Sequence, residues 1–348
     1  MKVGLLDAPG HLALVDRPEP SAGPGELVVE LAACGVCGTD LEKLRGNYQS
    51  AGRLGHEPVG RILEVGPGVE GYGVGERVFV HHHVPCLHCP VCQRGDTTFC
   101  PEYGRTNIDP GGFAERFRVP ADNVERGAVL HLSDTVDWSV GTLLEPAACA
   151  RTALRRVGFA PGDSVFIVGL GPVGLLYARL AHALGAGWVG GAELSPRRRR
   201  AAVEGGAAVA VDPREEGAAE EAVRRATQGA GVDLAVVATG ATPAVRLASA
   251  LARRGGTLNL FGLPEAGSQL PVDLQSLYLR GVRVVPTYAT TEPDVRDVHD
   301  LLVAGRLDLE GLVTHRVALA SLPEAFSMAA RPEEALKVVV TGPAFGPA

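Results

Sequence analysis

The sequence predicts an α/β protein that combines a doubly wound parallel sheet with a second, discontinuous domain of short strands. Three observations support this prediction. The chain has 348 residues, more than one hydrophobic core usually holds. Up to about Arg118, Gly and Pro divide the chain into short apolar segments with little helical periodicity. After Trp138, strand-like and helix-like segments alternate, which is typical of parallel sheets.

The N-terminal part is expected to form a closed or partly closed β domain. Its clearest strand candidates are Leu27–Ala33, Gly60–Val65 and Arg77–Val80. Glycine-rich turn clusters at residues 66–68 and 71–73 separate them.

The stretch from Ser164 to Gly185 predicts a strand, a glycine turn and a helix. A short apolar run precedes a Gly-x-Gly-x-x-Gly turn, and apolar residues then recur at gaps of three and four. In this context the turn indicates a dinucleotide site, whereas alone it could be purely structural. The free N–H groups at the start of the helix would bind a pyrophosphate. The candidate residues of this turn are Gly169, Gly171, Pro172, Val173 and Gly174.

The remaining strands of the parallel sheet are expected at Trp188–Glu193, Ala208–Val211, Leu234–Ala238, Thr257–Phe261 and Val282–Val285, with a helix from about Pro196. A further helix (Pro293–Ala304) and strand (Leu336–Val340) exceed what a six-stranded nucleotide domain requires, so we expect the C-terminal segment to return to the β domain. The predicted boundaries are 1–148 and 288–348 for the β domain, and 149–287 for the nucleotide-binding domain.

Glu193 is the candidate residue for the cofactor ribose. It ends the second predicted strand, 19 residues beyond Gly174. A carboxylate there accepts the 2′-hydroxyl of NAD and repels the 2′-phosphate of NADP. The sequence therefore favours NAD, although the basic run Arg197–Arg200 leaves NADP open.

Four closely spaced cysteines predict a structural zinc site. Cys86, Cys89, Cys92 and Cys100 form a C-x2-C-x2-C-x7-C pattern, and four thiolates leave no open position for a substrate. The lobe that they would hold together spans about residues 84–102.

A second candidate metal site is spread along the chain. Cys37, His56, Glu57 and Glu145 could form a zinc shell with an exchangeable position, as catalysis requires. Cys34 and Cys37 also match a C-x-x-C redox pair, but the thioredoxin-like context is missing. We therefore expect Cys34 and Cys149 to be small buried side chains.

The composition of the chain narrows the classes of molecule that it is expected to bind. The formal net charge of −7 argues against general binding to nucleic acid or to an anionic membrane. No apolar run reaches the roughly 18 residues of a membrane span, and the N-terminus lacks a signal-peptide pattern. A cytoplasmic protein with reduced thiols is expected, so metal binding explains the cysteines better than disulfides.

Six motifs together resemble the zinc-dependent medium-chain dehydrogenase/reductase superfamily, which includes alcohol, sorbitol and threonine dehydrogenases. They are CGTD (37–40), GHE (55–57), the four-cysteine lobe, GGFAE (111–115), LLEP (143–146) and GLGPVG (169–174). Their order and spacing match over nearly the whole chain, from Met1 to about Thr341. The resemblance implies a GroES-like barrel for the β domain and a Rossmann fold for the nucleotide-binding domain.

The resemblance also implies roles for individual residues. Cys37, His56 and Glu57 would hold or flank a catalytic zinc, and Glu145 is similar to a glutamate of the sorbitol and threonine branch. Asp40 would orient His56, and Thr39 would take the substrate proton. Arg198 would lie beside the adenine of the cofactor. Each chain would bind two Zn²⁺ ions, one catalytic and one structural, together with NAD.

Glu42 stands where the family usually has a histidine that passes the substrate proton to solvent. It is either a relay or a solvated residue, in which case water removes the proton directly.

The implied substrate is a secondary alcohol or polyol, or the corresponding ketone. A threonine dehydrogenase-like oxidation of an amino alcohol is the alternative, and a non-catalytic NAD(H)-binding protein is the rival from another class. The resemblance also implies a homo-oligomer, a tetramer or a dimer.

Overall fold

The computed structural model describes residues 1–8, 10–47 and 53–346. The chain forms two compact units. Unit 1 comprises Met1–Ala148, Thr290–Gly305 and Glu310–Ala348, and unit 2 comprises Cys149–Ala289 and Arg306–Leu309. Helix α5 (Leu144–Val157) runs across the first boundary.

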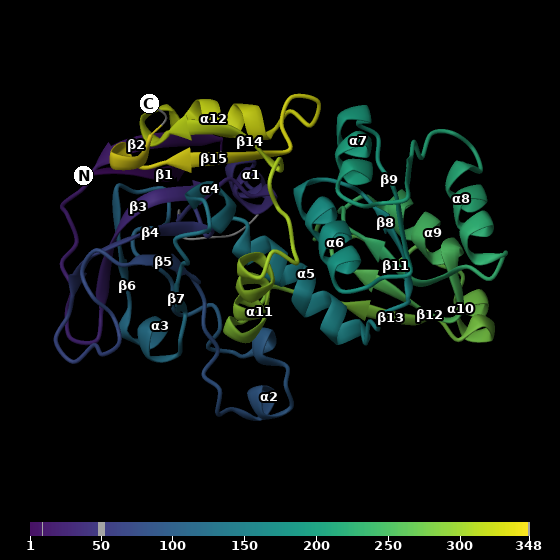
Figure 1. The fold of residues 1–348 in the computed structure, drawn as a ribbon, viewed down its shortest axis with the longest axis horizontal. Coiled ribbons are helices and arrows are strands. Elements are labelled where there is room, and N and C mark those ends of the chain that lie inside the picture. The colour runs from purple at the N-terminus through teal and green to yellow at the C-terminus, as the bar shows by residue number, and fades with distance from the viewer. Residues whose placement is uncertain (9, 48–52, 347–348) are drawn as a thin grey trace. The chain divides into compact units, whose positions relative to one another are not determined.

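Unit 1 is mainly antiparallel β-structure (Figure 1). Its largest sheet has the order β14-β15-β3-β4-β5-β7, with β6 also paired to β3, and β1 and β2 form a separate two-stranded sheet. The elements in chain order are β1 (Lys2–Ala8), β2 (His11–Asp16), β3 (Leu27–Gly35), α1 (Gly38–Leu44), β4 (Pro58–Val65), β5 (Arg77–Val80), α2 (Pro90–Gln93), β6 (Arg116–Val119), α3 (Ala121–Glu125), β7 (Val129–His131), α4 (Trp138–Gly141), α11 (Glu292–Val303), β14 (Val313–Ala318), α12 (Leu322–Ala329) and β15 (Lys337–Thr341).

Strand β3 organises this unit because it is buried along almost its whole length. Its side chains Leu27 and Leu31 share a core with Ile62 of β4 and Phe117 of β6. Strand β15 pairs antiparallel with the other end of β3, in the register Val339↔Gly35. The C-terminal segment therefore completes the N-terminal sheet, which confirms the predicted discontinuous β fold.

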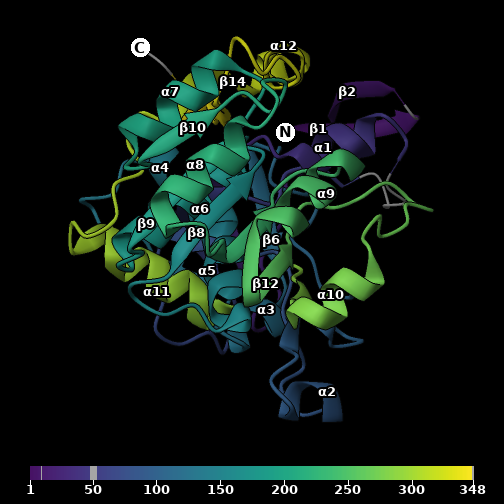
Figure 2. The same ribbon diagram turned by 90° about the vertical axis from the view of Figure 1, so that its right-hand side faces the viewer.

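Unit 2 is a six-stranded parallel sheet in the order β10-β9-β8-β11-β12-β13. Its elements in chain order are β8 (Ser164–Val168), α6 (Pro172–Ala183), β9 (Trp188–Ala192), α7 (Pro196–Glu204), β10 (Val209–Val211), α8 (Ala218–Thr227), β11 (Val232–Val237), α9 (Thr242–Leu251), β12 (Ala252–Leu260), α10 (Leu274–Arg280) and β13 (Arg283–Pro286). Helices α6 and α7 lie on one face of the sheet and α8 and α9 on the other (Figures 1 and 2). This arrangement confirms the predicted doubly wound sheet.

The largest boundary error concerns β12. The strand begins at Ala252, five residues before the predicted start at Thr257. The intervening Arg253-Arg254-Gly255-Gly256 lacks the apolar side chains on which the prediction relied. Strand β9 ends at Ala192, so Glu193 is the first residue after the strand rather than its last.

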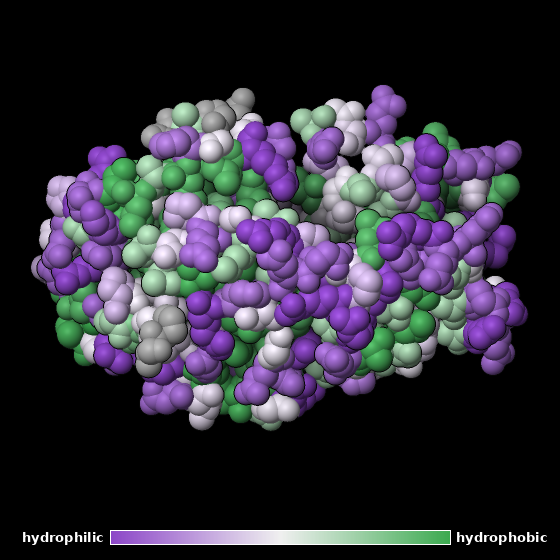
Figure 3. Space-filling model, turned by 90° about the horizontal axis from the view of Figure 1, so that it is seen from above, coloured by the Kyte–Doolittle hydropathy of each residue, from purple (hydrophilic) through white to green (hydrophobic). Residues whose placement is uncertain are grey.

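No helix within the described ranges is long and apolar enough to cross a membrane. Hydrophilic and apolar residues are interspersed over the face shown in Figure 3.

Candidate functional site

Cys37, His56 and Glu57 come together in unit 1. Cys37 is the residue before α1, and His56 and Glu57 directly precede β4. One potential ligand atom of each residue lies within 4.8 Å of the others. His56 is 9 % exposed and Glu57 is fully buried. A thiolate, an imidazole and a carboxylate at this separation form a donor set that suits zinc.

Asp40 connects the two segments that carry these residues. Its Oδ2 accepts a hydrogen bond from the Cys37 N–H (3.1 Å), and its Oδ1 accepts one from the Gly55 N–H (3.2 Å). Oδ1 also lies 3.5 Å from His56 Nδ1. Asp40 thereby orients the imidazole and leaves its other nitrogen for a ligand, as buried carboxylates behind metal-bound histidines do.

The electrostatics of the cluster favour a cation. Burial disfavours a charged imidazole, but Asp40 and Cys37 outweigh it and hold the pKa of His56 well above its usual value. Acidic groups that stabilise an imidazolium would also stabilise a divalent metal ion, which binds the neutral imidazole. The residues therefore fit a zinc ion.

The cluster also includes a buried ion pair. Lys337 of β15 donates to Glu57 Oε1 at 2.7 Å, and the two side chains are 3 % and 0 % exposed. Gly35 makes room for this pair, because a Cβ there would lie 1.8 Å from Glu57 Oε2. Burial raises the pKa of Glu57 against the opposing attraction of Lys337. The Glu57 carboxylate is thus shared between a lysine and the metal-ligand cluster.

Glu145 lies in the first turn of α5 and is 7 % exposed. It is outside the group of ligand atoms that meet the 4.8 Å limit. Its negative charge nevertheless raises the pKa values of Glu57 and Lys337, so it lies close to their pair.

Thr39 and Glu42 differ in their relation to this cluster. The Thr39 hydroxyl is 3.7 Å from Cys37 Sγ. The Glu42 carboxylate accepts hydrogen bonds from Arg45 Nη1 (2.5 Å) and Asn47 Nδ2 (2.7 Å). The bonds from Asn47 and Arg45 lower the pKa of Glu42. Thr39 therefore sits beside the candidate ligands, whereas Glu42 is held at the end of α1.

The residues after β5 form a histidine group that sequence reasoning missed. The His82 ring centroid lies 5.2 Å from that of His56, and the buried His82 Nδ1 has no hydrogen-bond partner among the described residues. Burial and the neighbouring histidines lower the pKa of His82 well below its usual value. His81 Nδ1 lies 2.9 Å from Glu292 Oε1, also in the interior of unit 1. The signal was the run of three histidines at 81–83, shortly before the first lobe cysteine.

The four-cysteine lobe has the geometry of a tetrahedral thiolate site. The Sγ atoms of Cys86 and Cys92 are 4.0 Å apart, those of Cys89 and Cys100 3.9 Å, and those of Cys86 and Cys100 3.5 Å. Zinc–sulfur bonds of about 2.3 Å in a tetrahedron place sulfurs about 3.8 Å apart. The backbone N–H groups of His88 and Cys89 lower the pKa of Cys86 to about 6, which favours the thiolate. The lobe therefore fits a zinc ion.

Cys34 and Cys149 belong to neither candidate metal site, and they differ from each other in burial. Cys34 is fully buried, and burial raises the pKa of its thiol well above the usual value. It is therefore a small core side chain, as predicted. Cys149 is partly exposed, so its predicted burial is wrong.

Unit 2 brings the predicted glycines together at the end of β8. Gly169 has φ +95°, and a Cβ on Gly174 would lie 2.0 Å from the Gly169 carbonyl oxygen. A Cβ on Gly171 would meet only Arg198 Nη1, at 3.7 Å. Pro172 and Val173 begin α6 directly after this turn. Gly169 and Gly174 are therefore required by the turn and its packing, whereas the space beside Gly171 fits a pyrophosphate.

Glu193 reaches back to this turn. Its Oε2 accepts a hydrogen bond from the Leu170 N–H (2.9 Å), and its Oε1 accepts one from the Ser195 N–H (3.0 Å). The carboxylate is thus fixed at the C-terminal edge of the parallel sheet, where α/β proteins bind nucleotides.

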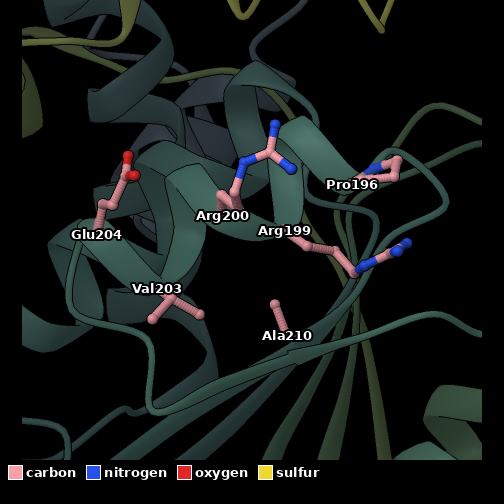
Figure 4. A pocket seen from close by; sticks show the side chains of 6 residues that line it. All are labelled: Pro196, Arg199, Arg200, Val203, Glu204 and Ala210. Atoms are coloured by element: carbon pink, nitrogen blue, oxygen red, sulfur yellow. The ribbon is translucent and has the colours of Figure 1, made fainter.

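A separate hollow of about 450 Å³ lies between α7 and β10 (Figure 4). Its lining is formed by Pro196, Arg199, Arg200, Val203, Glu204 and Ala210. The three glycines, Glu193 and Arg198 are not part of this lining, so the hollow is distinct from the glycine turn.

Comparisons with known proteins identify the family. Residues 23–128 match the alcohol dehydrogenase GroES-like domain, and residues 172–304 match the zinc-binding dehydrogenase family. Sorbitol dehydrogenase of Bacillus subtilis is 31 % identical over 98 % of this chain and 97 % of that protein. L-threonine 3-dehydrogenase of Pyrococcus abyssi is 34 % identical over 88 % of this chain and 87 % of that protein.

Comparison with solved structures points to the same family. A Sinorhizobium meliloti protein crystallised with NADP has a TM-score of 0.88 and 29 % identity, with 98 % of each chain covered. The resemblance inferred from the six motifs is therefore confirmed. This chain belongs to the zinc-dependent medium-chain dehydrogenase/reductase superfamily.

Proposed function

We propose that this protein is an NAD(P)-dependent zinc dehydrogenase that interconverts a secondary alcohol or polyol and its ketone. The observation that carries the proposal is the Cys37–His56–Glu57 cluster, with Asp40 fixed behind the imidazole. A zinc ion bound there would stabilise an alkoxide near neutral pH, and the nicotinamide would accept the hydride.

The residues of the chain then have defined tasks. Cys37 and His56 hold the metal, and either Glu57 or Glu145 supplies the carboxylate ligand. Thr39 accepts the proton of the substrate hydroxyl, because its own hydroxyl lies beside Cys37 Sγ. Asp40 keeps the imidazole oriented.

The cofactor residues lie in unit 2. Gly171 lets the pyrophosphate approach the backbone, and the start of α6 supplies N–H donors from Val173 and Gly174. Pro172 has no N–H to donate and begins the helix with its fixed backbone conformation. Glu193 binds the ribose, and Arg198 lies beside the bound dinucleotide. NAD is the preferred cofactor, because a carboxylate at Glu193 disfavours a 2′-phosphate.

The second zinc is structural. Cys86, Cys89, Cys92 and Cys100 would hold it and close the lobe, which contributes few residues to the core of unit 1.

The proposed substrate class is based on the two enzymes from other organisms to which this chain is similar in sequence. Sorbitol and L-threonine dehydrogenases are both similar to this chain, so polyols and amino alcohols are the classes to compare. A polyol or simple secondary alcohol is our preferred assignment.

We further infer a homo-oligomer in the cytoplasm. Strand β13 is an edge of the unit 2 sheet, and the nearby helix α10 exposes Leu274, Tyr278 and Leu279. An edge strand with apolar neighbours suits pairing with a second copy, in a dimer or a tetramer. None of the seven cysteines, all of which lie in the described part of the chain, is assigned to a disulfide, and this supports a reducing compartment.

The test combines metal analysis with a substrate panel. We expect two zinc ions per chain and NAD-dependent oxidation of at least one compound among diols, polyols, amino alcohols and simple secondary alcohols. Oxidation of L-threonine alone would favour the amino-alcohol assignment. Zinc and NADH binding without turnover of any panel member would favour a non-catalytic NAD(H)-binding protein.

A further inference from the structure

Asp212 holds two arginines beside the segment that presents Glu193. It follows β10 directly and is 8 % exposed. Its Oδ2 accepts from Arg199 Nη1 (3.1 Å) and Arg214 Nη2 (2.5 Å), and its Oδ1 accepts from Arg214 Nε (2.9 Å). The carboxylate is therefore fully engaged by two guanidinium groups.

The same guanidinium groups reach the backbone carbonyls of Glu193 and Leu194. Arg199 Nη1 donates to the Glu193 carbonyl (2.7 Å) and the Leu194 carbonyl (2.8 Å), and Arg214 Nη2 lies 3.5 Å from the latter. Both positive charges thus lie next to the residue whose carboxylate would meet the cofactor ribose.

Two adjacent guanidinium groups are a strong phosphate-binding arrangement, because their N–H donors match phosphate oxygens. At this place they would suit the 2′-phosphate of NADP. Here Asp212 engages Arg214 Nε and Nη2, and it shares Arg199 Nη1 with the carbonyls of Glu193 and Leu194. Arg200, the next residue of the basic run, leaves α7 in another direction from Arg199 (Figure 4), so it does not replace them.

We propose that Asp212 is a cofactor-specificity residue, which keeps Arg199 and Arg214 from a 2′-phosphate and so supports Glu193 in favouring NAD over NADP. The proposal rests on the proposed dinucleotide site in unit 2. It would account for a preference for NAD even though Arg199 belongs to a run of four arginines after β9. If Asp212 were purely structural, it would only fix Arg199 against the carbonyls of Glu193 and Leu194, and it would not affect the choice of cofactor.

The test measures binding of NADH and NADPH from the change in nicotinamide fluorescence, independently of turnover. Glu193→Ser provides the background, because it removes the carboxylate that repels a 2′-phosphate directly. Adding Asp212→Asn should tighten NADPH binding at least tenfold and change NADH binding less than threefold. Adding Arg214→Gln to that double variant should remove most of the gain. Glu221→Gln removes an equal charge from a carboxylate on α8 that also binds two arginines, Arg224 and Arg225, so it is the matched control and should leave both affinities unchanged.

A second comparison does not depend on the folding of Asp212→Asn. With Asp212 intact, Arg214→Gln in the Glu193→Ser background should change NADPH affinity less than twofold, as should Arg200→Gln. A fivefold loss caused by Arg214→Gln would show that Arg214 already contacts the phosphate, and would overturn the proposal. So would a folded Glu193→Ser/Asp212→Asn variant with unchanged NADPH affinity. Failure of the wild type to bind either cofactor would instead contradict the proposed function.

Discussion

Lys337 Nζ lies 2.7 Å from Glu57 Oε1 in the interior of unit 1, beside the candidate ligands Cys37 and His56. The two residues are 280 positions apart in the chain and meet because β15 pairs with β3. Removing one partner of such a pair leaves the other charge buried and uncompensated, which is strongly destabilising.

Lys337→Met should therefore destabilise unit 1 by about 3–5 kcal/mol at neutral pH. The measurement is urea unfolding of the variant and the wild type after removal of zinc, because bound zinc would itself compensate the Glu57 charge. Loss of the lysine raises the pKa of Glu57 further. A carboxyl group whose pKa is higher in the folded state costs stability as the pH rises above its unfolded pKa. The destabilisation should thus be smaller at pH 5 than at pH 8.

The control is the double variant Glu57→Gln/Lys337→Met, which carries no buried charge at the pair. It should recover part of the lost stability and lose the pH dependence. Equal stability of Lys337→Met and the wild type at pH 8 would show that the Glu57 carboxylate does not depend on Lys337 for its charge.

The two zinc sites should respond differently to loss of a thiolate. Cys37→Ser should abolish turnover while one zinc per chain and the thermal midpoint of unfolding are retained. Cys92→Ser should lower the thermal midpoint or disturb assembly, because the lobe depends on its metal. Metal analysis and calorimetry of both variants decide the point. Full activity of Cys37→Ser, or a single zinc in the wild type, would contradict these roles.

The glycine turn and the cysteine lobe could be predicted because each is a local pattern. Gly169, Gly171 and Gly174 lie within six residues of one another, and the lobe cysteines within fifteen. Their spacing therefore carries most of the geometry.

Other parts of the site depend on contacts between distant segments. The partner of Glu57 is a lysine of the last strand, which no local pattern identifies. His82 approaches His56 only because β5 lies next to β4. In the sequence, Asp212 cannot be distinguished from an ordinary turn residue. Its proposed role follows only from the ion pairs of its carboxylate with Arg199 and Arg214.

Two glycines of the same turn should respond differently to replacement by alanine. In Gly174→Ala the new Cβ would overlap the Gly169 carbonyl oxygen, at 2.0 Å. Overpacking of this kind costs about 1–3 kcal/mol, so the thermal midpoint should fall. Gly171 has φ −63° and open space beside it, so Gly171→Ala should fold with unchanged stability.

Gly171→Ala should nevertheless weaken NADH binding at least tenfold, because its methyl group would occupy the space proposed for the pyrophosphate. Fluorescence titration and thermal unfolding of both variants measure the two effects separately. Tight NADH binding by Gly171→Ala would place the pyrophosphate elsewhere.

The substrate proton must leave the site after Thr39 has accepted it. A carboxylate relay works only when ionised, so its contribution is lost as the pH falls through its pKa. Asn47 and Arg45 lower the pKa of Glu42 below its usual value, so the residue stays ionised throughout the neutral range. Single-turnover rates of hydride transfer should therefore show no inflection from Glu42 between pH 5 and 8.

Glu42→Gln should slow hydride transfer about tenfold, within the usual range for general acid–base groups. Glu42→His should introduce an inflection near pH 6–7, since an ordinary histidine has a pKa of about 6.5. Zinc-bound water titrates near pH 7, so only the comparison of the three profiles is decisive. Arg45→Gln is the matched control: it removes one partner of Glu42 but keeps the carboxylate, and should leave the rate at pH 7 within twofold. If Glu42→Gln transfers hydride as fast as the wild type, bulk water is the proton acceptor and Glu42 serves only to hold the end of α1.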